Sequence, residues 1–159
     1  MSFFPDMGCS AFVAKGDHVR AIGWLHPDHV YTTGEVSAEF LTRLKAFVAQ
    51  SSASAEALWF GACAGYHTCE FCGKAHGVGN FGVPSGERLF VAPEMIVHYI
   101  EKHGYKPPAE FVTAVLRSPL PETEEYQLIT EPFWHLHRGM VQRMIQATKE
   151  AEQKRGRDS

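Results

Sequence analysis

Hydrophobic and polar positions in the first third of the chain follow two different periods. Residues 18–25 alternate well enough between apolar and polar side chains to predict a β-strand. Beyond residue 37, apolar residues recur at helical spacing and form one stripe: Phe40, Leu41, Leu44, Phe47 and Val48. Ser37 stands just before this stripe and can accept a hydrogen bond from a free helix N–H. We therefore expect a strand, a turn and an amphipathic helix with Ser37 as its N-cap.

Two short apolar runs predict strands in the middle of the chain, at residues 58–60 and 88–92. A helix is expected to follow over residues 93–103. Pro93 suits the first helical position, and Gly104 suits the left-handed conformation that often ends a helix.

Two more helices are expected near the C-terminal end. The first covers residues 109–117 and is preceded by two prolines, whereas residues 118–125 read as a loop. The second is amphipathic, and its apolar positions are Phe133, Leu136, Met140, Val141, Met144 and Ile145. Residues 50–57, rich in Ser and Ala, are expected to form a loop.

Taken together, these elements predict an α+β fold with a small antiparallel sheet and about four helices. A chain of 159 residues buries enough surface for a hydrophobic core without help from a metal or a disulfide. Hydrophobic residues at 45% and charged residues at 21% exclude a disordered or fibrous protein. We expect one domain over residues 1–148, with residues 149–159 as a frayed, charged tail.

The segment from residue 61 to residue 86 is dense in Gly, Cys and His and holds little that would pack as a helix. Gly77-x-Gly79-x-x-Gly82 formally matches a dinucleotide-binding fingerprint, but no strand precedes it and no helix follows it. We interpret it as a flexible connection.

The strongest chemical signal is Cys69-x-x-Cys72, followed by His98 and His103 at the end of the expected helix. A Cys-x-x-Cys turn directs two thiolates at one cation, and Gly73 permits the tight backbone that such a turn needs. Two thiolates and two imidazoles suit tetrahedral zinc better than magnesium or calcium. The sequence therefore predicts a zinc site within a ββα zinc-finger-like unit at residues 66–104.

Other ligand sets remain open. Cys63, His67 and His76 lie nearby in the sequence, and a three-ligand site drawn from them would leave a position for catalysis. Glu94 stands four residues before His98 and could orient its imidazole. A redox role for Cys69 and Cys72 is less favoured, because a redox pair is usually followed by a helix and here a glycine-rich run follows.

Charge and targeting signals bear on partners and compartment. A net charge of −3 disfavours duplex nucleic acid, which binds through a surplus of Lys and Arg. No run of apolar residues is long enough for a transmembrane helix, and the start of the chain has neither a basic region nor a long apolar one. Four cysteines do not make a disulfide scaffold, so we expect a reducing cytoplasm.

Residues 69–73 and 98–111 together resemble a group of small uncharacterised bacterial proteins. These proteins carry a similar Cys-x-x-Cys-Gly turn and a His-Tyr-Ile-Glu-x-His-Gly helix end, and residues 23–25 and 33–36 look similar too. The resemblance implies a bacterial setting and the same four metal ligands, and it supplies no activity.

Three functions follow as hypotheses. The first is a non-catalytic binding or regulatory module with a structural zinc ion and another protein as partner. The second is a zinc-dependent hydrolase with an open metal site, and the third is a nucleic-acid-binding protein. The number of protein ligands separates the first two, because four ligands close a zinc site and three leave it open.

Overall fold

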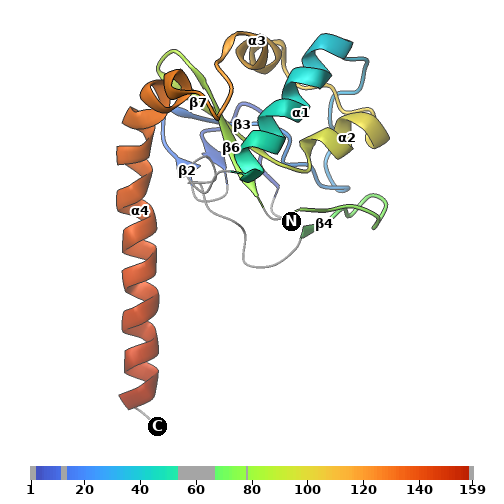
Figure 1. The fold of residues 1–159 in the computed structure, drawn as a ribbon. Helices are drawn as coiled ribbons and strands as arrows, with labels where there is room; N and C mark the ends of the chain where they lie inside the picture. Colours follow the sequence, from blue (N-terminus) through green and yellow to red (C-terminus); the bar gives the residue numbers. More distant parts are fainter. Residues whose placement is uncertain (1–2, 12–13, 54–66, 78, 158–159) are drawn as a thin grey trace.

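A computed structural model of the chain describes residues 3–11, 14–53, 67–77 and 79–157 (Figure 1). Its elements in chain order are β1 (Ser10–Ala11), β2 (Ala14–Lys15), β3 (Val19–Ala21), α1 (Ala38–Ala53), β4 (His67–Thr68), β5 (His76–Gly77), β6 (Asn80–Ser85), β7 (Arg88–Pro93), α2 (Ile96–His103), α3 (Ala109–Arg117) and α4 (Glu124–Arg157). The predicted α+β class is confirmed.

The central sheet has three strands in the order β3–β7–β6. Strands β6 and β7 form an antiparallel hairpin, in register from Asn80 opposite Pro93 to Ser85 opposite Arg88. Strand β3 runs parallel to β7, with Val19 opposite Leu89. The sheet is thus mixed where the sequence suggested an antiparallel one, because the long connection that contains α1 brings the chain back in the same direction. Two small antiparallel pairs, β1–β2 and β4–β5, complete the described strands.

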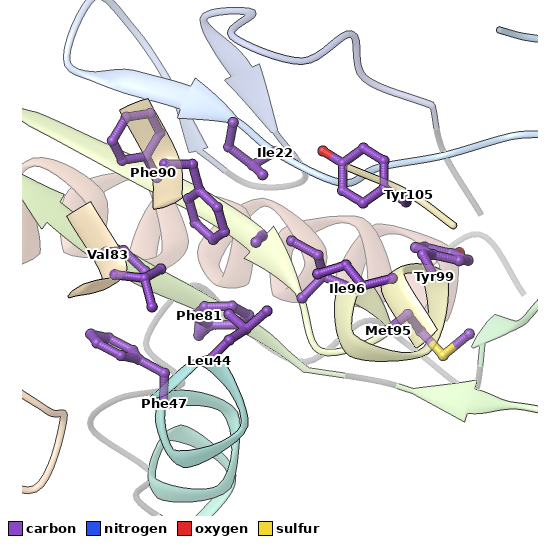
Figure 2. Packing of buried hydrophobic residues seen from close by; sticks show 14 of the residues in the cluster. Ile22, Leu44, Phe47, Phe81, Val83, Phe90, Met95, Ile96, Tyr99 and Tyr105 are labelled. Carbon is purple, nitrogen blue, oxygen red and sulfur yellow. The ribbon is translucent and has the colours of Figure 1, made fainter. Parts of the chain in front are cut away.

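Side chains alternate between the two faces of β7 and belong to two separate clusters of buried hydrophobic residues. Phe90 and Ala92 belong to the main core, where they pack with α1, α2 and α3. Leu89 and Val91 point into a smaller cluster on the other face, together with Trp24 and with residues of β3. Figure 2 shows the main core, in which aromatic side chains fill the space between the sheet and the helices. Figure 1 shows these three helices on one side of the sheet and α4 extending away from the opposite side.

Two helices begin with a hydroxyl side chain that caps the free backbone N–H groups. The Ser37 hydroxyl accepts a hydrogen bond from the Phe40 N–H at 3.1 Å, which confirms the predicted N-cap of α1. The Thr123 hydroxyl accepts one from the Tyr126 N–H at 3.2 Å at the start of α4. The loop predicted over residues 118–125 is therefore slightly shorter than expected, because α4 already begins at Glu124.

Three predictions require correction. Helix α2 begins at Ile96 rather than at Pro93, since Pro93 still pairs with Asn80 and belongs to β7. The expected flexible connection at residues 77–82 lies largely within strands β5 and β6. The expected loop at residues 50–57 is helical up to Ala53, and the strand predicted at residues 58–60 lies outside the described residues.

The charged tail is also more regular than expected. Helix α4 continues to Arg157, and the side chains of residues 149–157 are exposed. A division of the chain at residue 148 therefore stays a prediction. Over the described part of the chain, no helix has both the length and the apolar character needed to span a membrane.

Candidate metal centre

The β4–β5 hairpin places the two cysteines. The Cys69 N–H donates to the Ala75 carbonyl at 2.8 Å, which closes the hairpin below the turn. The Gly73 N–H donates to the Cys69 carbonyl at 2.7 Å, and Gly73 adopts a φ of 68°, a conformation that favours glycine. The short Cys-x-x-Cys sequence therefore folds into a tight turn that brings both sulfurs to one side. We call residues 67–77 the knuckle.

Helix α2 places the two histidines. Its buried face, formed by Ile96, Tyr99 and Ile100, anchors it to the core. His98 lies in the first turn and His103 is the last helical residue, directly before Gly104, whose φ of 64° ends the helix. Residues five apart diverge by about 140° around an ideal helix axis. The two imidazoles still converge, and their ring centroids lie 4.9 Å apart.

The four side chains meet at one point. The Cys69 Sγ lies 3.4 Å from the His103 Nε2, and the Cys72 Sγ lies 3.4 Å from the His98 Nε2. The two Nε2 atoms are 3.2 Å apart, and all four ligand atoms lie within 4.8 Å of one another. These residues lie close enough to bind a metal ion.

The distances can be compared with those around tetrahedral zinc. Bonds of about 2.3 Å to sulfur and about 2.05 Å to nitrogen give edges of about 3.5 Å between S and N and about 3.3 Å between two N atoms. The observed spacings of 3.4 Å and 3.2 Å agree with both edges. The donor set and these three distances thus fit a metal ion of the size of zinc.

Local electrostatics act on the protonation of the ligands. Burial raises the pKa of the Cys69 thiol, and hydrogen bonds from the backbone of Cys72 and Phe71 act in the opposite direction by favouring the thiolate. Burial also lowers the pKa of His98, and the neighbouring His103 and Lys102 lower it further. The neutral imidazole that results is the form that binds metal.

Aromatic side chains cover the site. The Phe71 ring lies 5.1 Å from the His103 ring and 5.9 Å from the Tyr99 ring, measured between centroids. Tyr31 packs edge-on against Phe71 at 5.6 Å, and its hydroxyl donates to the His103 carbonyl at 2.9 Å. These contacts fix the end of α2, while Cys69 is buried and the other three candidate ligands stay partly exposed.

A second contact joins the knuckle to the preceding loop and was not predicted. The His26 Nδ1 accepts a hydrogen bond from the Asp28 N–H at 3.1 Å, so the proton of the neutral ring resides on Nε2. That Nε2 lies 3.1 Å from a Glu70 carboxylate oxygen and can donate to it. The only signal in the sequence was the pair of histidines in the turn at residues 26–29 and the carboxylate between the two cysteines.

The alternative ligands lie elsewhere. His67 and His76 are on β4 and β5, and the His76 Nδ1 contacts the Thr68 hydroxyl at 2.9 Å. Glu94 precedes α2 and lies against Gly77. Cys63 is outside the described residues. Among the residues that the structure describes, the one group of three or more metal-ligating side chains is the predicted set of four.

Comparison with known proteins adds one finding. The model of a family described as a domain of unknown function (DUF7919) matches residues 2–116, which include the knuckle and α2 and end before α4. No curated protein and no solved structure matches the chain.

Proposed function

The chain belongs to the DUF7919 family, and from this premise we propose that it is a non-catalytic binding module with a closed structural zinc site. One observation carries the proposal. Two thiols and two imidazoles of the described residues bring their ligand atoms within 4.8 Å of one another, and their two S–N contacts of 3.4 Å match the edges of a zinc tetrahedron. Four protein ligands complete the usual coordination of structural zinc, whereas catalytic zinc keeps a position for water.

The donor chemistry favours zinc over other common divalent ions. Thiolates are soft ligands that suit zinc, and magnesium and calcium are bound by oxygen ligands. When bound, zinc supplies a crosslink with no redox chemistry of its own. Cys69 and Cys72 then hold the knuckle, and His98 and His103 hold α2, so that two segments distant in sequence become one rigid unit.

The partner that we propose is another protein, and a groove beside the metal centre supports this part of the proposal. It encloses about 460 Å³ between the N-terminal segment and the loop that carries His26 and Tyr31. Phe3 and Phe4 line it, and the Phe3 ring stacks on the His29 ring at 3.7 Å. Aromatic side chains on a surface groove are typical anchors for a protein partner. The His26–Glu70 contact connects this groove to the knuckle.

Metal analysis and one pair of variants test the closed zinc site. Wild-type protein should contain one zinc per chain. Cobalt substituted for zinc should give the strong visible absorption of a tetrahedral thiolate site, unchanged by added azide. Cys72→Ser should lose the bound metal and lower the thermal midpoint. Cys9→Ser is the matched control, because Cys9 is exposed and is not one of the four ligands.

The same measurements separate the alternatives. A cobalt spectrum that responds to azide would indicate an open position and favour the zinc-dependent hydrolase. Metal content unaffected by Cys72→Ser would remove Cys72 from the ligand set and refute a four-ligand site.

A further inference from the structure

The two thiols of the knuckle differ in their access to solvent. Cys69 is buried, whereas Cys72 is partly exposed. Gly73 and Lys74, which follow Cys72 in the turn, are exposed as well. A cysteine reacts with oxidants as a thiolate that solvent can reach, and a buried structural cysteine is inert. A small oxidant in solution therefore meets Cys72 before it meets Cys69.

The same turn holds the two sulfurs within reach of each other. The Gly73 N–H donates to the Cys69 carbonyl at 2.7 Å and closes the backbone around both cysteines. Their Sγ atoms belong to a group whose ligand atoms all lie within 4.8 Å of one another. A tight turn keeps Cα atoms three positions apart within about 7 Å, which is the range that disulfides span. Small movements of the two side chains are therefore enough to form a disulfide.

From this difference in exposure and this proximity we propose that Cys69 and Cys72 form a reversible oxidation site, at which a hydroperoxide converts the two thiolates into a disulfide and the metal is released. The inference rests on the zinc site proposed above and adds a means of emptying it. The role differs from that of a disulfide oxidoreductase, in which a helix follows the redox pair, because strand β5 follows this pair.

The oxidation takes place in two steps. The Cys72 thiolate attacks one oxygen of the hydroperoxide, so that an S–O bond forms, the O–O bond breaks and the leaving oxyanion takes a proton from solvent. The product is a sulfenic acid, whose sulfur has given two electrons to the peroxide. The Cys69 thiolate then attacks that sulfur, so that the S–S bond forms, the S–O bond breaks and hydroxide leaves and takes up a second proton. With hydrogen peroxide, two thiolates, one peroxide and two protons give one disulfide and two waters.

Formation of the disulfide detaches the knuckle from α2. Zinc is bound by thiolates, so only His98 and His103 remain of the four ligands. The knuckle then keeps the pairing of the two-residue strands β4 and β5, which is marginal in water. Phe71 packs against the rings of His103 and Tyr31, and Tyr31 also lines the groove proposed for the partner. Oxidation should therefore loosen one wall of that groove.

Peroxide treatment of the zinc-loaded, full-length protein tests the oxidation site. Hydrogen peroxide should release one zinc, detected with a coloured chelator, for each disulfide formed. Peptide mapping should place this disulfide between Cys69 and Cys72, and a dithiol reductant with added zinc should restore the bound metal. Zinc that stays bound during the treatment, or that leaves without this disulfide, would overturn the proposal.

Cys72→His is the matched control, because it keeps a metal ligand at this position and removes one of the two thiols. It should release zinc to peroxide on the order of tenfold more slowly than wild-type protein, since no disulfide can form within the turn. Equal rates in the two proteins would contradict the proposed step. If this variant binds no zinc, the ratio of released zinc to disulfide in wild-type protein decides alone.

The order of attack has its own readout. When a trap for sulfenic acids such as dimedone is present during oxidation of wild-type protein, Cys72 should carry the label. A label mainly on Cys69 would refute the assignment of the exposed thiol as the first to react. Methionine oxidation is recognised separately, because it adds an oxygen atom and forms no disulfide.

The metal content of the reduced protein separates this inference from the proposed function. Reduced protein without zinc would refute the metal site and the release of metal together. Zinc that is bound in the reduced protein and retained under peroxide would overturn the oxidation site and leave the metal site intact.

Discussion

At the scale of single residues, one half-buried carboxylate joins the N-terminal segment to the chain that follows the candidate metal ligands. Asp6 accepts a hydrogen bond from the Gly23 N–H at 2.9 Å and one from the Tyr105 hydroxyl at 2.8 Å. Burial raises the pKa of Asp6, and the two hydrogen bonds act against this effect. Both hydrogen bonds therefore stabilise the charged form of the Asp6 carboxylate.

Tyr105→Phe should lower the free energy of unfolding by about 1.5–3 kcal/mol, because it removes a hydrogen bond to a half-buried charged group. Tyr105 is fully buried, and the substitution changes little else in the packing. Urea unfolding of wild-type protein, Tyr105→Phe, Asp6→Asn and the double variant measures the coupling between the two side chains. Additive effects of the two substitutions would show that the hydrogen bond does not contribute.

The pH dependence of the Tyr105→Phe effect follows from the same pKa shift. Because the pKa of Asp6 is raised in the folded state, its contribution to stability is complete below the unfolded pKa and decreases as pH rises through the folded pKa. Loss of the Tyr105 donor should raise that pKa further. The difference in unfolding free energy between wild-type protein and Tyr105→Phe should thus grow with pH. A difference independent of pH would contradict this assignment.

At the scale of secondary-structure elements, the end of α2 determines where His103, the last candidate metal ligand, lies. Gly104 follows His103 directly, has a φ of 64°, and donates its N–H to the Tyr99 carbonyl. A Cβ atom at this position would meet no atom within 4 Å, so a substitution disturbs only the backbone. Gly86 has the same kind of conformation, with a φ of 61° and equally open space, but it lies in the β6–β7 turn.

Gly104→Ala and Gly86→Ala should each cost about 1–2 kcal/mol of stability, because both place a Cβ in a left-handed conformation. If the proposed zinc site is right, only Gly104→Ala should also weaken zinc binding, since relief of the strain displaces His103. Competition with a coloured chelator measures this affinity. Equal zinc affinity in the two variants would mean that the end of α2 does not position the ligand.

The elements also show what local sequence can predict. Residue types and spacing sufficed to predict which four side chains lie close together, because a Cys-x-x-Cys turn and two histidines near a helix end are local patterns. The helix predicted from Pro93 starts late because a ladder with Asn80 extends the strand, and this pairing depends on a segment more than ten residues away. The parallel pairing of β3 with β7 and the His26–Glu70 contact join segments even further apart, and no local period encodes them.

At the scale of the whole molecule, we expect the hydrophobic core and the proposed metal site to stabilise different regions of the chain. The main core contains residues of α1, α2, α3, β6 and β7 and needs no ligand to exclude water. The knuckle has only two short strands, and its anchor in the core is Cys69, with Phe71 packed at the edge. The backbone pairing of two-residue strands is marginal in water. We therefore expect the metal to order the knuckle and the core to order the rest.

Removal of the metal should accordingly open the knuckle and leave the body folded. After chelation, amide hydrogen exchange should accelerate in residues 67–77, which lose the crosslink to α2, while the amides of β6 and β7 stay protected. Circular dichroism should change little, because none of the four candidate ligands lies on α1, α3 or α4. The thermal midpoint should fall, since zinc binds the folded protein and stabilises it by mass action. Readdition of zinc should restore protection in the knuckle, and a chelated protein that unfolds as a whole would show instead that the core cannot hold the fold without metal.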